Sequence, residues 1–229
     1  MRRRRITTAW MLLPLCGLFA SVARAGTTLL SESDAAAGVR AALERGANVA
    51  VAGLGRTDGF LANPKVRIEL PGFLSDAAKL LKATGQRRRV DELVTAMNRA
   101  AEAAVPEAKT LLVGAVKSMS VEDALKIVRG SETSVTEFFS GKTREPLGVK
   151  FLPIVSRATE RVALAKKYDA VAGKAAAMGL LKRDDADLNG YVTGKALDGL
   201  YFMIGEEEKK IRRDPLGTGS ALLRKVFGG

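Results

Sequence analysis

Apolar residues recur at intervals of three and four along most of the chain, which is the spacing of one face of an α-helix. The clearest stripe lies in residues 87–104, where Val90, Leu93, Val94 and Met97 are followed by alanines at the same spacing. Similar stripes predict further helices over residues 33–52, 74–84, 169–179 and 190–213. The pattern therefore favours a fold built mainly from helices.

Prolines, glycines and capping residues predict where some of these helices begin and end. Pro106 suits the first turn of a new helix, because a first-turn N–H has no partner in the helix. Residues 134–137 resemble a capping box and predict a short helix that closes at Gly141. Another helical stripe covers residues 147–165, and Pro153 inside it predicts a kink or a restart.

One segment has a different period. In residues 64–71, Val66, Ile68 and Leu70 alternate with charged residues. One strand cannot form a sheet alone, so this segment is either an extended strap over the helices or an edge that pairs elsewhere. With no internal repeat and no linker, we predict an all-α fold. It is a single-domain bundle of seven to nine helices with a short extended or β segment near 65–70.

The N-terminus has the pattern of a secretory signal peptide. Four arginines precede an uncharged, mostly apolar stretch over residues 6–22, and the small residues Ala23 and Ala25 follow. We therefore expect residues 1–25 to be cleaved. Residues 26–229 would then form one helical domain in the periplasm or outside the cell, with no transmembrane segment.

Two other interpretations of this segment stay open. A retained membrane anchor needs about 20 apolar residues, and the run here is just shorter. A lipid could be attached to Cys16, although the preceding Leu15 is not the small residue normally found at that place.

Composition narrows the possible functions. The chain has 229 residues, 37 of them Lys or Arg and 25 Asp or Glu. Removal of residues 1–25 takes five arginines and no acid, which lowers the net charge from +12 to +7. It also takes the only cysteine, and the chain has no histidine. Triads that use His, and the usual zinc, copper, haem and iron–sulfur ligand sets, are thereby excluded. We expect no cofactor.

A turn-rich loop before the extended segment is a candidate ligand site. Arg56 and Arg67 could hold an anion, with Asp58 and Asn63 beside them and Asp58 orienting the arginines. The alternative is a structural connection, in which Asp58 and Asn63 accept hydrogen bonds from the backbone.

A weak calcium candidate lies further on. Asp185, Asp187 and Asn189, followed by Gly190, resemble the first half of an EF-hand loop. Ala196 occupies the position of the bidentate glutamate, so the ligand set is incomplete. The alternative is that Asp187 or Asn189 caps the next helix, and we expect no metal.

Three further features allow two interpretations each. Residues 87–89 are all arginine and could meet a phosphate-rich surface, or form a solvated first helical turn. Residues 206–208 are all glutamate and could hold a cation, or form a salt-bridged surface with the lysines that follow, which is the arrangement we expect. Helices that contain glycine and alanine allow either close packing or an apolar cavity.

Several of these segments together resemble a known family. They are residues 55–71, residues 98–108, residues 191–201 and residues 206–212. They are similar to a bacterial family of exported proteins catalogued only as a domain of unknown function, the 4197 family. The resemblance covers about residues 28–228. It implies an exported, mostly helical protein of bacteria of the Gram-negative type, and it assigns no catalytic or binding residue.

These observations support two hypotheses about function. The first is a non-enzymatic envelope module that binds a partner protein or an anionic or apolar ligand such as a lipid. The alternative is a periplasmic hydrolase or lyase with two carboxylates, for which Glu107, Glu137, Glu160 and Asp198 are available but not singled out as a pair. Nucleic-acid binding is not expected, because acids and bases are interleaved and aromatic residues are scarce.

Overall fold

The computed structural model of the chain describes residues 30–177 and 187–228, and these contain eight helices and no strand. The helices are α1 (Glu32–Leu54), α2 (Gly72–Ala83), α3 (Arg87–Ser118), α4 (Ala124–Val128), α5 (Ser134–Arg161), α6 (Leu164–Ala177), α7 (Leu188–Arg213) and α8 (Ala221–Phe227). The all-α, single-domain prediction is confirmed. The expected signal peptide, residues 1–25, and Asp185 lie outside the described residues.

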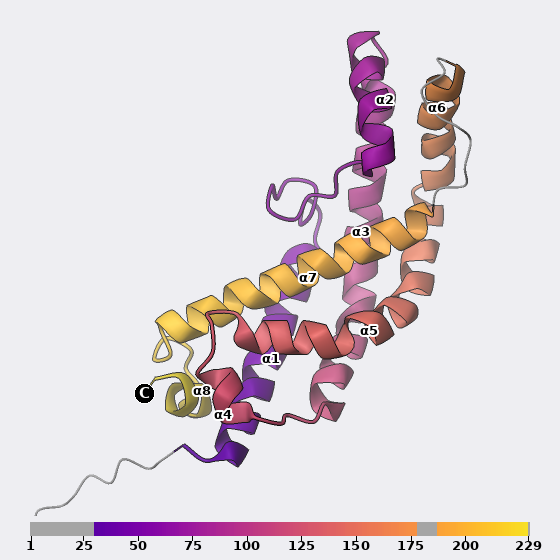
Figure 1. Cartoon of the computed structure of the whole chain (residues 1–229). Coiled ribbons are helices and arrows are strands. Elements are labelled where there is room, and N and C mark those ends of the chain that lie inside the picture. The colour runs from indigo at the N-terminus through magenta and orange to yellow at the C-terminus, as the bar shows by residue number, and fades with distance from the viewer. Residues whose placement is uncertain (1–29, 178–186, 229) are drawn as a thin grey trace, which may run out of the picture.

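The helices form a packed body with a projection (Figure 1). In the body, α1 packs on α7 and α3, and α5 packs on both α3 and α7. Its core contains Leu43, Met97, Phe139, Phe151 and Leu200, all essentially buried. The projection consists of α2, the first half of α3 and α6, which run side by side away from α7. None of the described helices combines the length and the apolar character needed to cross a bilayer.

Helix α3 does not end where the sequence predicts a new helix. Pro106 lies inside it, although a proline in a helix removes one backbone hydrogen bond. The apolar stripe continues in phase through this point, and Ala101, Val105, Ala108 and Leu112 are all buried. Burial on both sides of the proline therefore keeps the two halves in one helix.

Helix α5 is also longer than predicted. It continues through Gly141, where the short helix was expected to close, and it contains Pro146 and Pro153. Phe139 and Leu147 are buried on either side of Gly141, so the same core contact extends across the glycine. Figure 1 shows α5 turning upward along its second half, where prolines are the expected cause of a bend.

Residues 55–71 cross the helices, and we call them the strap. They make a series of turns up to residue 66 and run without turns over residues 67–71, with no strand beside them in the described chain. Val66 and Ile68 are buried, whereas Arg67 and Glu69 are exposed. The predicted alternation is present, and of the two arrangements left open by the sequence the strap is the one observed.

Some helix glycines permit close packing. A Cβ on Gly38 of α1 would lie 2.6 Å from a methyl group of Val226 in α8. A Cβ on Gly199 of α7 would lie 2.7 Å from the ring of Phe60 in the strap. At Gly141, Gly173 and other positions a Cβ would meet nothing within 4 Å, so these glycines instead leave open space.

This difference predicts opposite effects of the same substitution. Gly199→Ala should lower the free energy of unfolding by about 1–3 kcal/mol, because Phe60 is fully buried and cannot move aside. Gly173→Ala in α6 should raise it by about 1 kcal/mol, through helix propensity alone. Urea unfolding measures both, and changes of the same sign would contradict the packing described.

Candidate functional site

The strap is held by a buried asparagine of α3. Asn98 is fully buried, and its Oδ1 accepts a hydrogen bond of 2.8 Å from the Ile68 amide. Its Nδ2 donates to the carbonyl oxygens of Ile68 and Val94, each at 2.8 Å. One side chain therefore pairs both backbone groups of Ile68, which a neighbouring strand would otherwise pair.

A buried carboxylate one turn further along α3 holds the start of the strap. Oε1 of Glu102 accepts from the amides of Phe60 and Leu61, each at 3.0 Å. Its Oε2 accepts from Arg99 at 2.6 Å, and Arg99 also donates to Asp58 at 2.8 Å. The side-chain hydrogen bond to Glu102 raises the pKa of the Arg99 guanidinium above its ordinary value.

The four residues predicted to bind a ligand in this loop contact the chain itself or solvent. Asp58 pairs with Arg99, and Asn63 Oδ1 accepts from the Lys65 amide. Arg67 donates to the Leu61 carbonyl and pairs with Glu69, while Arg56 is exposed. Ligand binding by Arg56, Asp58, Asn63 and Arg67 stays a prediction, and these contacts favour the structural alternative.

The described part of the calcium candidate is also engaged in local structure. Asp187 Oδ1 accepts from the Gly190 amide at 2.7 Å and caps α7. Asn189 Oδ1 accepts from the Thr159 hydroxyl at 2.7 Å. Within the described residues, no group of three or more acidic, His or Cys side chains is placed to hold a metal ion.

These contacts predict that calcium has no effect on stability. Addition of millimolar CaCl₂ should leave the melting temperature unchanged in a thermal scan, since ligands bound only to the folded state would raise it. A rise of several degrees with calcium, but not with the same concentration of MgCl₂, would contradict the capping role.

The acidic run on α7 differs from its prediction as a salt-bridged surface. Glu206 is partly exposed and pairs with Lys65 and Lys209 as expected. Glu207 and Glu208, however, are buried, with 5% and 2% of their surface exposed. Both still form the predicted kind of local salt bridge, Glu207 with Lys210 and Glu208 with Arg212. The prediction is therefore wrong only in placing these two residues on the surface, because segments distant in the chain cover them.

Glu208 caps a helix to which it does not belong. It accepts from the amides of Val135 and Thr136 at the start of α5, at 3.1 and 2.8 Å. Arg212, one turn later on α7, donates to the same carboxylate at 2.9 Å. The side chain of Thr133, the N-cap residue of α5, accepts no hydrogen bond from the amides of the helix, so the first turn of α5 is completed from α7.

Glu208→Ala should lower the free energy of unfolding by about 3–5 kcal/mol, because it leaves Arg212 and two helix amides without their acceptor. Glu206→Ala, two residues away, removes a partly exposed ion pair and should cost about 1 kcal/mol or less. Equal losses in chemical denaturation would show that burial of Glu208 does not matter.

The carboxylates considered for catalysis have partners of their own. Glu107 lies 3.1 Å from Arg157, and Glu137 accepts from the Thr133 hydroxyl at 2.6 Å. Asp198 pairs with Arg144 and Lys195. Glu160 lines a hollow beside α6, and none of the other three carboxylates lines it. These contacts do not bring two of the four to one cleft.

Besides the hollow at Glu160, two further hollows lie along α5. The first, of about 700 Å³, lies between α5 and α7. Its lining includes Gly141, Gly148, Gly190 and Gly194, with exposed Val149 and Leu152 at its side. The sequence allowed either close packing or an apolar cavity at helix glycines, and the glycines here line an apolar hollow. Its two charged lining residues, Arg144 and Glu145, have opposite signs, and it therefore shows no preference for a charged ligand.

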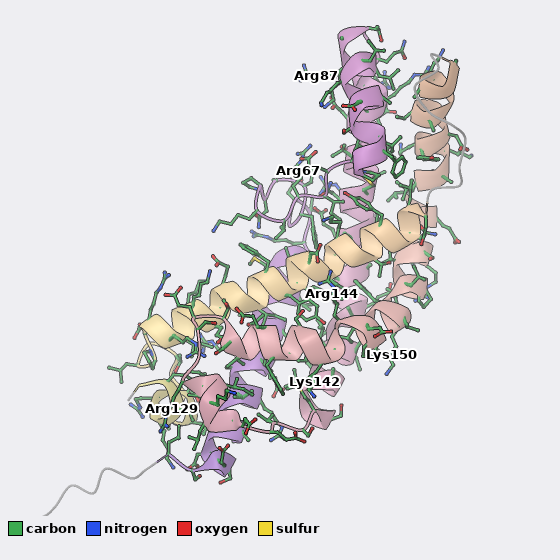
Figure 2. The ribbon with its side chains drawn as sticks, viewed as in Figure 1. Arg67, Arg87, Arg129, Lys142, Arg144 and Lys150 are labelled. Carbon is green, nitrogen blue, oxygen red and sulfur yellow. The ribbon has the colours of Figure 1, made fainter. Side chains whose placement is uncertain are left out.

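The second hollow, of about 500 Å³, lies between α5 and the C-terminal half of α3, and we call it the α3–α5 pocket. Its apolar lining consists of Leu111, Ala115, Met119, Pro146 and Leu147. Lys142 and Lys150 line it from α5, and Figure 2 shows both on the side of α5 turned away from Arg144. No acidic residue of the described chain lines it.

The charge of this pocket is uncompensated. Lys142 and Lys150 are exposed and form no ion pair within the described residues. Arg40 of α1 donates to the carbonyl of Met119, and its buried Nε has no hydrogen-bond partner. Three cations without acidic partners therefore lie in or next to a pocket with an apolar floor.

The hydroxyl of Thr143, although it lines the pocket, is committed to the core. It donates to the Phe139 carbonyl at 2.6 Å and accepts from the Tyr201 hydroxyl at 3.0 Å. Burial raises the pKa of the Tyr201 phenol, so this group stays neutral. The polar groups left for a ligand are the two lysines and the exposed Thr110, Ser118 and Ser120.

Sequence reasoning missed this pocket for an identifiable reason. Lys142 and Lys150 are eight residues apart, and this spacing brings two side chains to one side of a helix. The predicted helix end at Gly141 placed them outside a common helix. The signal was present, but it required α5 to continue through Gly141 and Pro146.

The segments that resemble the 4197 family meet in space around the strap. Residues 55–71 form it, and Asn98 and Glu102 hold it. From α7, Gly199 packs against Phe60 and the Tyr191 hydroxyl donates to the Glu69 carbonyl.

The comparison with known families confirms the resemblance. The family model described as "Protein of unknown function (DUF4197)" matches residues 29–228. The chain belongs to DUF4197. No curated protein and no solved structure matches it. The match to DUF4197 covers the whole described fold, but the description of the family names no activity. A proposal about function therefore rests on the residues and hollows of this structure.

Proposed function

We propose that this DUF4197 chain is an exported, non-enzymatic envelope protein that binds a small anionic amphiphile of the lipid class in the α3–α5 pocket. The observation that carries the proposal is the pair Lys142 and Lys150, which lack acidic partners and lie over an apolar floor. Of the two functions considered from the sequence, this is the binding module, now with a class of ligand and a site.

The two halves of the pocket suit the two halves of such a ligand. A carboxylate or phosphate can accept charged hydrogen bonds from lysine, which are stronger than those between neutral groups. An alkyl chain can cover Leu111, Met119 and Leu147, which removes apolar surface from water. The volume of about 500 Å³ falls in the range of small-ligand sites.

Export is part of the proposal and is supported by the signal-peptide pattern of residues 1–25. Without them the chain keeps a positive charge of +7, which suits an anionic ligand. A binding role also needs none of the side chains, such as His, that the sequence lacks. The carboxylate hydrolase alternative gains no support from the contacts of Glu107, Glu137 and Asp198.

The test compares ligands that have a charged group, an alkyl chain or both. We expect palmitate and hexadecyl phosphate to bind in isothermal titration, and hexadecanol to bind at least about tenfold more weakly, because it lacks a charge for the lysines. Inorganic phosphate alone should bind weakly or not at all, because it covers no apolar surface. The double variant Lys142→Gln, Lys150→Gln should remove the preference for the anionic amphiphiles.

A matched control removes two cations elsewhere. Lys126 of α4 and Arg129, the C-cap residue of α4, are exposed, line no pocket described here and form no ion pair within the described residues. Lys126→Gln, Arg129→Gln should leave the preference intact. Equal binding of palmitate and hexadecanol by the wild-type chain, or the same loss in both double variants, would overturn the proposal.

Filling the pocket should abolish binding without unfolding the chain. Gly114 of α3 lines the pocket, and a Cβ there meets nothing within 4 Å, so Gly114→Leu places its side chain in the ligand volume. Gly173→Leu on α6 is the control, because Gly173 also has open space but lies outside the pocket. Both should keep or raise the melting temperature. Binding of palmitate by Gly114→Leu with wild-type affinity would place the ligand elsewhere.

A further inference from the structure

The projection, which consists of α2, the first half of α3 and α6, has more basic than acidic residues. Residues 72–92 contain five Lys or Arg and three acids, and residues 164–177 contain three and one. Arg87, Arg88 and Arg89 follow the turn at Gly85, whose φ of +82° suits glycine, and all three are exposed. Figure 2 shows Arg87 near the far end of the projection.

The position of these arginines opposes helix stability. The N-terminus of a helix bears partial positive charge, and cations there are unfavourable. Gln86, the N-cap residue of α3, provides no side-chain hydrogen bond to offset this. Arg88 pairs with Glu92 at 2.9 Å and Arg87 lies 3.8 Å from Asp91, whereas Arg89 forms no ion pair within the described residues. Two of the three cations therefore have an exposed acidic partner one turn along α3, and Arg89 is left without one within the described residues.

Helix α2, which packs on α3 in the projection, also carries exposed apolar side chains. Phe73 and Leu80 are 50% and 41% exposed. They are seven residues apart, so they share one side of the helix, while Leu74 and Leu81 are buried against the rest of the projection. Lys79, also exposed, lies next to Leu80. Aromatic and aliphatic side chains flanked by lysine and arginine are typical of helices that lie in a membrane interface.

We propose that the projection docks on the surface of an anionic lipid bilayer. Arg87, Arg88 and Arg89 would contact lipid phosphates, and Phe73 and Leu80 would enter the interface without spanning it. This goes beyond ligand binding in the α3–α5 pocket and uses none of its residues. A nucleic acid or an acidic protein would satisfy the arginines but would give no role to the exposed Phe73 and Leu80.

The test is cosedimentation of the full chain with vesicles. We expect binding to vesicles that contain phosphatidylglycerol, weak binding to pure phosphatidylcholine, and loss of binding as salt rises. Arg87→Gln, Arg89→Gln should weaken the partition coefficient about 30-fold, at roughly fivefold for each cation. Phe73→Ser, Leu80→Ser should weaken it at least about tenfold while the charge is unchanged.

Two controls keep this test separate from the one on the pocket. Lys126→Gln, Arg129→Gln removes the same charge at α4, and Lys142→Gln, Lys150→Gln removes it from the pocket, so both should retain the greater part of vesicle binding. Circular dichroism checks that each variant is folded. Absence of binding to anionic vesicles, equal losses in all three charge variants, or no effect of Phe73→Ser, Leu80→Ser would each overturn membrane docking. Retained binding to a soluble polyanion such as heparin, without vesicle binding, would favour a macromolecular partner instead.

Discussion

The polar support that α3 gives to the strap is the interaction on which the fold depends most. An extended segment laid on helices has no neighbouring strand, yet its buried backbone groups must still be paired. Asn98 and Glu102 do this from inside the core. Their hydrogen bonds allow Phe60 and Ile68 to be fully buried. Segments 55–71, 98–108 and 191–201, which carry the resemblance to DUF4197, meet around this contact.

Elsewhere in the molecule, too, single residues join segments that are distant in the chain. Glu208 completes the first turn of α5 from α7, and Gly38 and Gly199 let neighbouring segments approach where a methyl group would not fit. Along α5, by contrast, small residues and unpaired lysines leave space and charge exposed on its two sides. The buried polar groups Asn98, Glu102 and Glu208 are thus paired inside the body, whereas Lys142 and Lys150 at the α3–α5 pocket form no ion pair within the described residues.

Much of this fold could be predicted from local pattern, and the remainder depended on long-range contacts. Helical stripes and the alternation of Val66 and Ile68 report burial directly, so the all-α bundle and the strap followed from them. Pro106 and Gly141 were predicted to be helix boundaries because local propensity marks them so, but core contacts on both sides override it. The burial of Glu208 could not be predicted, since the α5 amides that it caps lie more than 70 residues away in the chain. The α3–α5 pocket could not be predicted either, because a helix end expected at Gly141 separated Lys142 from Lys150.

The most direct measurement of the central claim is the lipid content of the protein itself. The full chain and its Lys142→Gln, Lys150→Gln variant would be purified without detergent from the envelope fraction of producing cells, extracted, and analysed by untargeted mass spectrometry. The account predicts close to one anionic amphiphile per wild-type molecule and a clear depletion in the variant. Wild-type protein that carries no amphiphile, or a variant that carries the same anionic species in the same amount, would contradict it.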